Sequence, residues 1–136
     1  MRILVIDDDP AMTDLLELLL TPAAAEVVTA NSGPDGIRLA KEIKPDIITL
    51  DLMMPDINGW KVAQTIREFS KVPILILSAL DSPGLVAAAL DAGADDYLIK
   101  PVPSSVLLAH INKLVRRNNL PALGLDLSLK SSRPVL

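Results

Sequence analysis

Five short apolar runs recur along the chain, and each is followed by a longer stretch in which apolar residues have helical spacing. The runs are rich in Ile, Val and Leu and too short for helices, which favours β-strands. Strands that alternate with helices in this way predict a parallel sheet joined by helical crossovers. The predicted strands are residues 3–6, 26–29, 46–50, 73–77 and 97–99.

Helices are expected on both faces of this sheet, because three of the runs are apolar almost throughout. The helices are predicted to begin near Pro10, Pro34, Trp60, Pro83 and Ser104, with Asp9 and Ser82 as caps of the first and fourth. Half of the 136 residues are hydrophobic and only 2% are aromatic, so the chain has one aliphatic core. The fold class is therefore α/β.

Composition excludes several classes of protein and site. Without cysteine there is no disulfide, thiolate nucleophile or cysteine-based zinc site. The apolar run after Met1 is too short for a signal peptide, and no stretch approaches a transmembrane span. A net charge of −4 argues against a nucleic-acid-binding surface on this domain. We expect a soluble, cytoplasmic protein without membrane contact.

Polar side chains gather where the predicted strands end, and ligands bind outside the carboxyl ends of strands in open parallel sheets. These residues are Asp7, Asp8 and Asp9 after the first strand, Asp51 after the third, Ser78 after the fourth and Lys100 after the fifth. Clustered carboxylates repel one another unless a cation lies between them, and Mg²⁺ prefers such oxygen ligands. With Mg²⁺ present, Asp51 could attack phosphorus as a carboxylate nucleophile, assisted by Lys100 and Ser78. The sequence contains neither a P-loop motif nor a G-x-G-x-x-G motif.

Four motifs, in order along the chain, resemble the receiver domain of two-component response regulators. They are residues 4–10 (LVIDDDP), 51–59 (DLMMPDING), 78–79 (SA) and 97–101 (YLIKP). The resemblance covers residues 1 to about 118. It implies a flavodoxin-like (βα)5 domain, a doubly wound five-stranded parallel sheet of strand order 2-1-3-4-5.

The resemblance also implies roles for individual residues. The phosphoacceptor falls on Asp51, and Mg²⁺ would be held by Asp7, Asp8 and Asp51 with the backbone carbonyl of Met53. Asp8 is preferred over Asp7 as the direct ligand.

The phosphate-contacting lysine falls on Lys100, which would be followed by a cis bond to Pro101. The switch hydroxyl falls on Ser78 and the rotating aromatic on Tyr97. A sensor histidine kinase would donate the phosphoryl group, and water would later remove it. The domain would assist both steps, yet it is a switch and not a turnover enzyme.

The resemblance implies that phosphorylation changes the face formed by the fourth helix, fifth strand and fifth helix. In regulators with winged-helix DNA-binding domains, a homodimer can form through this face. The residues that match the charged dimer interface of that subfamily are Asp95, Asp96 and Arg117. However, His110 stands where an arginine is usual and Val106 where an acidic residue is usual, and the fourth helix lacks its basic residue. These departures argue against salt-bridged dimerisation, and a more apolar contact is the alternative.

We divide the chain into a receiver at 1–118 and a linker or truncated effector domain at 119–136. Residues 124–136 resemble the opening hairpin of a winged-helix domain, and DNA would be a partner only through such a domain beyond residue 136. The alternative is a stand-alone receiver that acts by protein–protein contact.

Two further functions compete with the phosphoacceptor hypothesis. A phosphohydrolase of the haloacid-dehalogenase type would need a second aspartate two residues after its nucleophile, and Met53 stands there. A protein-interaction module on the same fold would not be phosphorylated at all.

Overall fold

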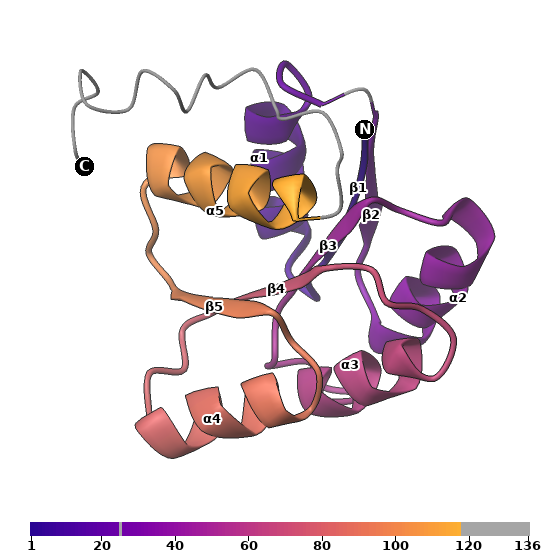
Figure 1. Ribbon diagram of the computed structural model, residues 1–136, viewed down its shortest axis with the longest axis vertical. Coiled ribbons are helices and arrows are strands. Elements are labelled where there is room, and N and C mark those ends of the chain that lie inside the picture. The colour runs from indigo at the N-terminus through magenta and orange to yellow at the C-terminus, as the bar shows by residue number, and fades with distance from the viewer. Residues whose placement is uncertain (25, 118–136) are drawn as a thin grey trace.

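The computed structural model describes residues 1–24 and 26–117. Strands and helices alternate strictly along this part of the chain (Figure 1). The elements are β1 (Arg2–Ile6), α1 (Pro10–Leu20), β2 (Glu26–Ala30), α2 (Gly33–Ile43), β3 (Ile47–Leu50), α3 (Gly59–Arg67), β4 (Ile74–Ser78), α4 (Pro83–Asp91), β5 (Asp96–Ile99) and α5 (Ser104–Arg116).

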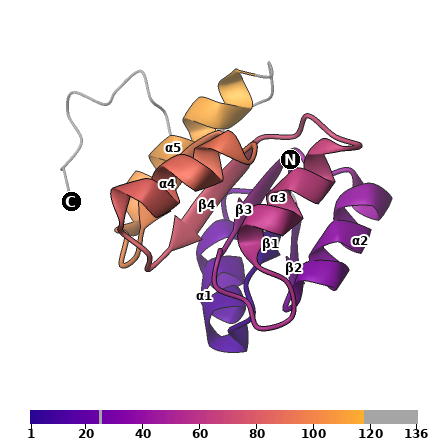
Figure 2. The same cartoon turned by 90° about the horizontal axis from the view of Figure 1, so that it is seen from below.

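All five strands belong to one parallel sheet of order β2-β1-β3-β4-β5, so the predicted topology is confirmed. Figure 2 shows the twisted sheet with β4, β3, β1 and β2 following one another across the molecule. The order reverses between β1 and β3, because the chain adds β2 on one side and β3 to β5 on the other. A sheet of this kind has its ligand site beside that reversal.

The helices cover both faces of the sheet, as Figure 1 shows: α1 and α5 lie on one face, and α2, α3 and α4 on the other. Successive residues of a strand point to opposite faces, so each central strand contributes to both cores. Ile3 and Val5 pack with α1 and α5, whereas Leu4 and Ile6 pack with α2 and α3. The predicted aliphatic character is confirmed, but the sheet divides the apolar residues into two cores where one was predicted.

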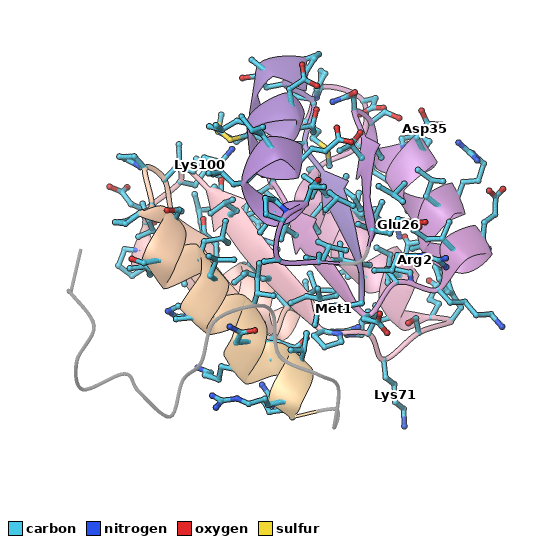
Figure 3. All side chains as sticks on the ribbon, turned by 90° about the horizontal axis from the view of Figure 1, so that it is seen from above. Met1, Arg2, Glu26, Asp35, Lys71 and Lys100 are labelled. Carbon is cyan, nitrogen blue, oxygen red and sulfur yellow. The ribbon has the colours of Figure 1, made fainter. Side chains whose placement is uncertain are left out.

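The strand register brings the polar residues to one edge of the sheet. Ile6, the last residue of β1, pairs with Ala30 on one side and Leu50 on the other. Ser78 pairs with Ile99 at the ends of β4 and β5. In Figure 3, Lys100 lies at this carboxyl edge and Met1 at the opposite end of the sheet.

Helix starts follow local capping chemistry. Asp9 caps α1 by accepting a hydrogen bond from the Ala11 N–H at 3.0 Å, as predicted. Ser82 is the N-cap residue of α4, as predicted, although its side chain accepts no hydrogen bond from the helix. Pro83 alone favours the helical backbone there.

Most predicted boundaries differ from the structure by one or two residues. α3 begins at Gly59, one residue earlier than predicted, because Asn58 accepts a hydrogen bond from the Lys61 N–H at 2.9 Å. It ends at Arg67, because the N–H groups of Glu68 and Phe69 bond to carbonyls three residues back. The predicted hairpin at 124–136 and the boundary at 118 lie outside the described residues. Among the helices that the structure describes, none is long and apolar enough to cross a membrane.

Candidate functional site

Asp7 and Asp51 follow neighbouring strands, and the backbone of the sheet holds both. The Asp7 N–H donates to the Ala30 carbonyl and the Asp51 N–H donates to the Ile6 carbonyl, each at 3.0 Å. Only 3% of Asp7 and 8% of Asp51 is exposed. Two carboxyl groups are therefore buried side by side at the point where the strand order reverses.

Lys100 supplies the positive charge between these carboxylates. Its N–H extends the pairing of β4 and β5 by donating to the Ser78 carbonyl at 2.8 Å, and its bond to Pro101 is cis, as predicted. The Lys100 ammonium lies 2.8 Å from Oδ2 of Asp7 and 3.1 Å from Oδ2 of Asp51. A partly buried ion-paired cluster results from residues far apart in the sequence.

Burial and charge shift the titration of this cluster. Burial raises the pKa of Asp7, and the hydrogen bonds from Lys100 and from the Asp9 N–H only partly oppose it. Burial alone would lower the pKa of Lys100, but its hydrogen bond to Asp7 and the charges of Asp51 and Asp7 raise that pKa overall. Lys100 is therefore a permanent cation at neutral pH.

The acidic residues Asp7, Asp8 and Asp51 each place a carboxylate oxygen within 4.8 Å of the others. Asp8 is the most exposed of the three and also lines an open pocket with Met53 and Trp60. A compact set of carboxylate oxygens, open to solvent on one side, suits a hard divalent cation that keeps several waters. The residues thus fit a Mg²⁺ site by their chemistry.

The loop after β3 orients Asp51. The Met53 N–H donates to Oδ1 of Asp51 at 3.1 Å, while Lys100 contacts the other carboxylate oxygen. The Met53 side chain itself is more than half exposed above the site. Both oxygens of Asp51 therefore have a donor, which fixes the plane of the carboxylate.

Ser78 and Tyr97 converge on a single residue of the loop after β4. The fully buried Ser78 accepts a hydrogen bond from the Leu80 N–H at 3.3 Å, and the Tyr97 hydroxyl donates to the Leu80 carbonyl at 2.6 Å. Burial raises the pKa of Tyr97, and the nearby charge of Asp51 contributes. Tyr97 also packs against the core on the α2–α4 face. Leu80 thus links the Ser78 hydroxyl, beside the acidic site, to Tyr97 in β5.

The structure adds three polar residues that sequence reasoning did not place at this edge. Asn58 caps α3 directly after the Asp51 loop, and an Asn before a helical pattern is a signal that could have revealed it. Asn31 bonds to the Asp7 carbonyl, and Thr13 bonds to Asn31. No local pattern marks these last two, because their partners are distant in the sequence.

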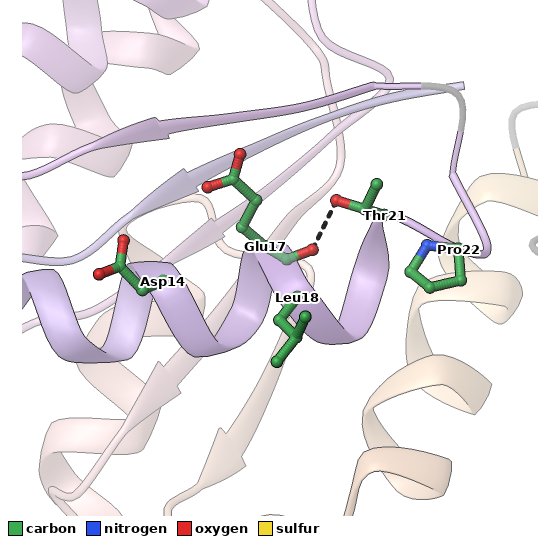
Figure 4. A pocket seen from close by; sticks show the side chains of 5 residues that line it. All are labelled: Asp14, Glu17, Leu18, Thr21 and Pro22. Carbon is green, nitrogen blue, oxygen red and sulfur yellow. Dashed lines mark hydrogen bonds between the residues drawn. The ribbon is translucent and has the colours of Figure 1, made fainter.

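Two hollows adjoin α1 outside the acidic cluster. One is an apolar groove between α1 and α5 that reaches Lys100, with Leu15, Leu19, Val102 and Leu107 among its walls. The other lies on the outer face of α1 (Figure 4), lined by Asp14, Glu17, Leu18, Thr21 and Pro22. There the Thr21 hydroxyl donates to the Glu17 carbonyl at 2.6 Å, so this hydroxyl bonds to the last turn of α1.

Comparison with protein families gives one domain. The family model of the response regulator receiver domain matches residues 3–112. Apart from Arg2 at the start of β1, this range contains the five strands of the sheet and every residue of the acidic site. The match and the geometry therefore concern the same part of the chain.

Curated relatives are transcription regulators. The transcriptional regulatory protein AfsQ1 of Streptomyces coelicolor is 44% identical over 115 residues, covering 85% of this chain and 51% of the relative. The transcriptional regulatory protein KdpE of Mycobacterium tuberculosis is 40% identical over 120 residues, covering 88% and 53%. The chain thus spans about half the length of the curated relatives it matches.

Solved structures agree with this assignment. A two-component response regulator from Clostridium difficile superposes with a TM-score of 0.83 at 29% identity, covering 88% of this chain and 99% of that one. The BeF3-activated receiver domain of RstA from Klebsiella pneumoniae superposes with a TM-score of 0.80 at 31% identity, covering 85% and 99%. The chain therefore belongs to the receiver domain family of two-component response regulators.

Proposed function

We propose that this domain is a phosphorylation switch in which Asp51 accepts a phosphoryl group from a sensor histidine kinase. The observation that carries the proposal is the cluster at the sheet edge, where Lys100 lies between Asp7 and Asp51 and Asp8 stands beside them. Carboxylates and one cation, held by backbone at a strand-order reversal, provide a nucleophile and a charge partner for phosphoryl oxygens.

In the proposed reaction, a carboxylate oxygen of Asp51 forms a bond to phosphorus as the phosphorus–nitrogen bond of a phosphohistidine breaks. The histidine nitrogen leaves with the bonding electrons, and an acyl phosphate remains on Asp51. Lys100 exchanges its contact with the carboxylate for the phosphoryl oxygens, and the Ser78 hydroxyl donates to another of them. Mg²⁺, held by Asp7, Asp8, Asp51 and the Met53 carbonyl, would neutralise charge on those oxygens.

Hydrolysis closes the cycle. Water attacks the phosphorus of the acyl phosphate, inorganic phosphate leaves, and the Asp51 carboxylate is restored. The domain would lose its own phosphoryl group by hydrolysis and act on no separate substrate, so its proposed role is regulatory.

Ser78 and Tyr97 would carry the signal. A phosphoryl group on Asp51 would draw the Ser78 hydroxyl away from the Leu80 N–H, its present partner. Because the Tyr97 hydroxyl is bonded to the same residue, a shift of Leu80 would change how Tyr97 packs and so alter β5. The face of α4, β5 and α5 would change with it.

A homodimer through that face would be held by apolar contacts more than by salt bridges. Asp95 is 2.7 Å from the Arg67 guanidinium, and Asp96 is 2.6 Å from His110, so both carboxylates have partners within the domain. Leu85, Leu90 and Ile99 are each more than a third exposed there. These side chains are the proposed contact between two copies.

The output itself would be transcription. One relative is named a DNA-binding dual master transcriptional regulator, from Synechocystis, and it is 41% identical over 121 residues. Because this chain spans half of such relatives, we propose a receiver at 1–118 and a linker or effector start at 119–136. DNA would be bound by the effector domain, in keeping with the acidic charge of this chain.

Labelling with acetyl phosphate and Mg²⁺ tests the proposed function. The wild-type chain should gain one phosphoryl group by intact mass, Asp51→Asn should gain none, and chelation of Mg²⁺ should abolish the gain. Asp56→Asn is the matched control, since Asp56 is an exposed aspartate in the same loop. A wild-type chain that gains no label, or label that survives in Asp51→Asn, would refute the phosphoacceptor role.

A further inference from the structure

Asp7 is held by its main chain as well as by its side chain. Its N–H donates to the Ala30 carbonyl at 3.0 Å, and its own carbonyl accepts a hydrogen bond from the Asn31 side-chain amide at 2.9 Å. Its side chain accepts from the Asp9 N–H at 2.9 Å. The direction in which residues 7–9 leave β1 thus depends on contacts with residues 30 and 31.

Asn31 reaches a second partner. The same amide nitrogen donates to the Thr13 hydroxyl at 3.0 Å, and that hydroxyl donates onward to the Pro10 carbonyl at 3.1 Å. Both hydrogens of the Asn31 amide are therefore bonded, one to the Asp7 carbonyl and the other to the Thr13 hydroxyl in the first turn of α1. Three separate segments, the ends of β1 and β2 and the start of α1, meet at one side chain.

Helix capping does not account for Asn31, and apolar packing does not account for the hydroxyl of Thr13. Ser32, not Asn31, caps α2, because its hydroxyl accepts the hydrogen bond from the Asp35 N–H. Thr13 is 2% exposed on the side of α1 that otherwise buries Leu16 and Leu20, where an aliphatic residue would pack without a polar group. A buried hydroxyl is costly unless paired, and this one is paired with the Pro10 carbonyl and with the Asn31 amide, which in turn holds the Asp7 carbonyl.

We propose that Asn31 and Thr13 are positioning residues that hold the turn of residues 7–9 in the shape that binds Mg²⁺. This inference rests on the proposed function. Lys100 contacts Asp7 and Asp51, but its single positive charge does not balance the three carboxylates of Asp7, Asp8 and Asp51. The remaining repulsion would spread the carboxylates apart if the turn were free. The Asn31–Thr13 pair opposes that spreading by fixing the Asp7 carbonyl and the first turn of α1. Groups that orient metal ligands in this way change metal affinity by about 10- to 100-fold when removed.

Mg²⁺ titration followed by Trp60 fluorescence tests the pair without requiring phosphorylation. Trp60 is the single tryptophan of the chain and lines the pocket that contains Asp8 and Met53. Thr13→Val removes the hydroxyl at almost constant shape, and Asn31→Ala removes the amide from an exposed position. Each should weaken Mg²⁺ binding about tenfold. Thr13→Ser keeps the hydroxyl and should bind as the wild type does.

Ser32→Ala is the matched control for stability. It removes a cap from the same loop but touches neither Asp7 nor Thr13, so it should lower the melting temperature and leave the Mg²⁺ dissociation constant unchanged. The double variant of Thr13→Val and Asn31→Ala should bind no more weakly than Asn31→Ala alone, because Asn31→Ala already removes both contacts of the amide.

The outcomes separate this inference from the proposed function. If the wild-type chain binds Mg²⁺ but Thr13→Val and Asn31→Ala bind equally well, the positioning role is overturned and the proposed function stands. If the Mg²⁺ dissociation constant rises as much in Ser32→Ala as in Thr13→Val and Asn31→Ala, the positioning role is also overturned. The loss of affinity would then follow the loss of stability. If the wild-type chain shows no Mg²⁺ response, both fall together.

Discussion

At the scale of the residue, Asp7 illustrates the conflict between stability and function. It is almost fully buried, and its salt bridge with Lys100 does not fully compensate for the water it has lost, so its pKa is raised. Such a carboxylate is maintained at a cost in folding free energy. Such a cost would be expected of a carboxylate that binds a cation from solution, which is the role proposed for Asp7.

Asp7→Asn should therefore stabilise the domain against urea at neutral pH without Mg²⁺. A raised folded-state pKa means that ionisation costs stability, and this cost appears as pH rises through the raised pKa. It is absent below the ordinary value of 3.8. The gain from Asp7→Asn should thus be present at neutral pH and disappear as pH falls towards about 4.

Urea denaturation of both proteins across this pH range provides the measurement. Adding Mg²⁺ should reduce the difference in stability between the two proteins. An ion that binds the folded state stabilises the wild type more than a variant that lacks one of the coordinating carboxylates. Equal stability of the two proteins at neutral pH would contradict the assigned electrostatics of Asp7.

At the scale of the element, the loop between β3 and α3 depends on close backbone approach. The Gly59 N–H donates to the Leu52 carbonyl at 3.0 Å. A Cβ atom at Gly59 would lie 2.5 Å from the backbone oxygen of Asp51 and 2.6 Å from Cα of Leu52. The start of α3 thus lies directly against the backbone of the candidate phosphoacceptor, which leaves space only for glycine.

Gly59→Ala should destabilise the domain by about 1–3 kcal/mol, the range for overpacking, because backbone must shift to admit the methyl group. The shift would also move Asp51, so acetyl phosphate labelling should slow. Chemical denaturation and the labelling rate give the two measurements.

Gly84→Ala in α4 is the comparison for this prediction. Only the Ser82 hydroxyl lies within 4 Å of a Cβ there, at 3.9 Å, so the same change should stabilise by about 0.4–1 kcal/mol. Similar effects at the two glycines would show that close approach at Gly59 is not the reason for its presence.

At the scale of the whole molecule, the two cores share every central strand. Leu75 and Leu77 of β4 pack with α1 and α5, while Ile74 and Ile76 pack towards α2–α4. Neither helical layer can detach without exposing strand residues of the same β4. The described part of the chain should therefore unfold as one cooperative unit.

Ile111→Ala tests this cooperativity. Ile111 is fully buried in α5, so truncation should cost about 2–5 kcal/mol. Trp60 packs on the opposite face of the sheet, yet its fluorescence should report the same lowered midpoint as far-UV circular dichroism. Separate midpoints for the two signals would show that the layers unfold independently.

Much of this domain could be predicted from the sequence alone. The alternation of apolar runs with helical patterns indicated the sheet and gave the element boundaries to within a residue or two, whereas the strand order was implied by the resemblance to receiver domains. Asp7, Asp51, Ser78 and Lys100 could be assigned to one edge because parallel strands all end on the same side. These inferences rest on periodicity and strand ends, which are local properties.

The tertiary structure alone decided which side chains meet. Lys100 contacts Asp7 across 93 residues, Asn31 donates a hydrogen bond to Thr13, and Arg67 of α3 donates one to Asp95 just before β5. No local pattern contains such pairs, because they depend on strand register and on how helices from distant segments pack. The sequence by itself therefore determined the fold class and the kinds of group at the site, whereas packing determined their partners, since distance in space is set by the whole fold.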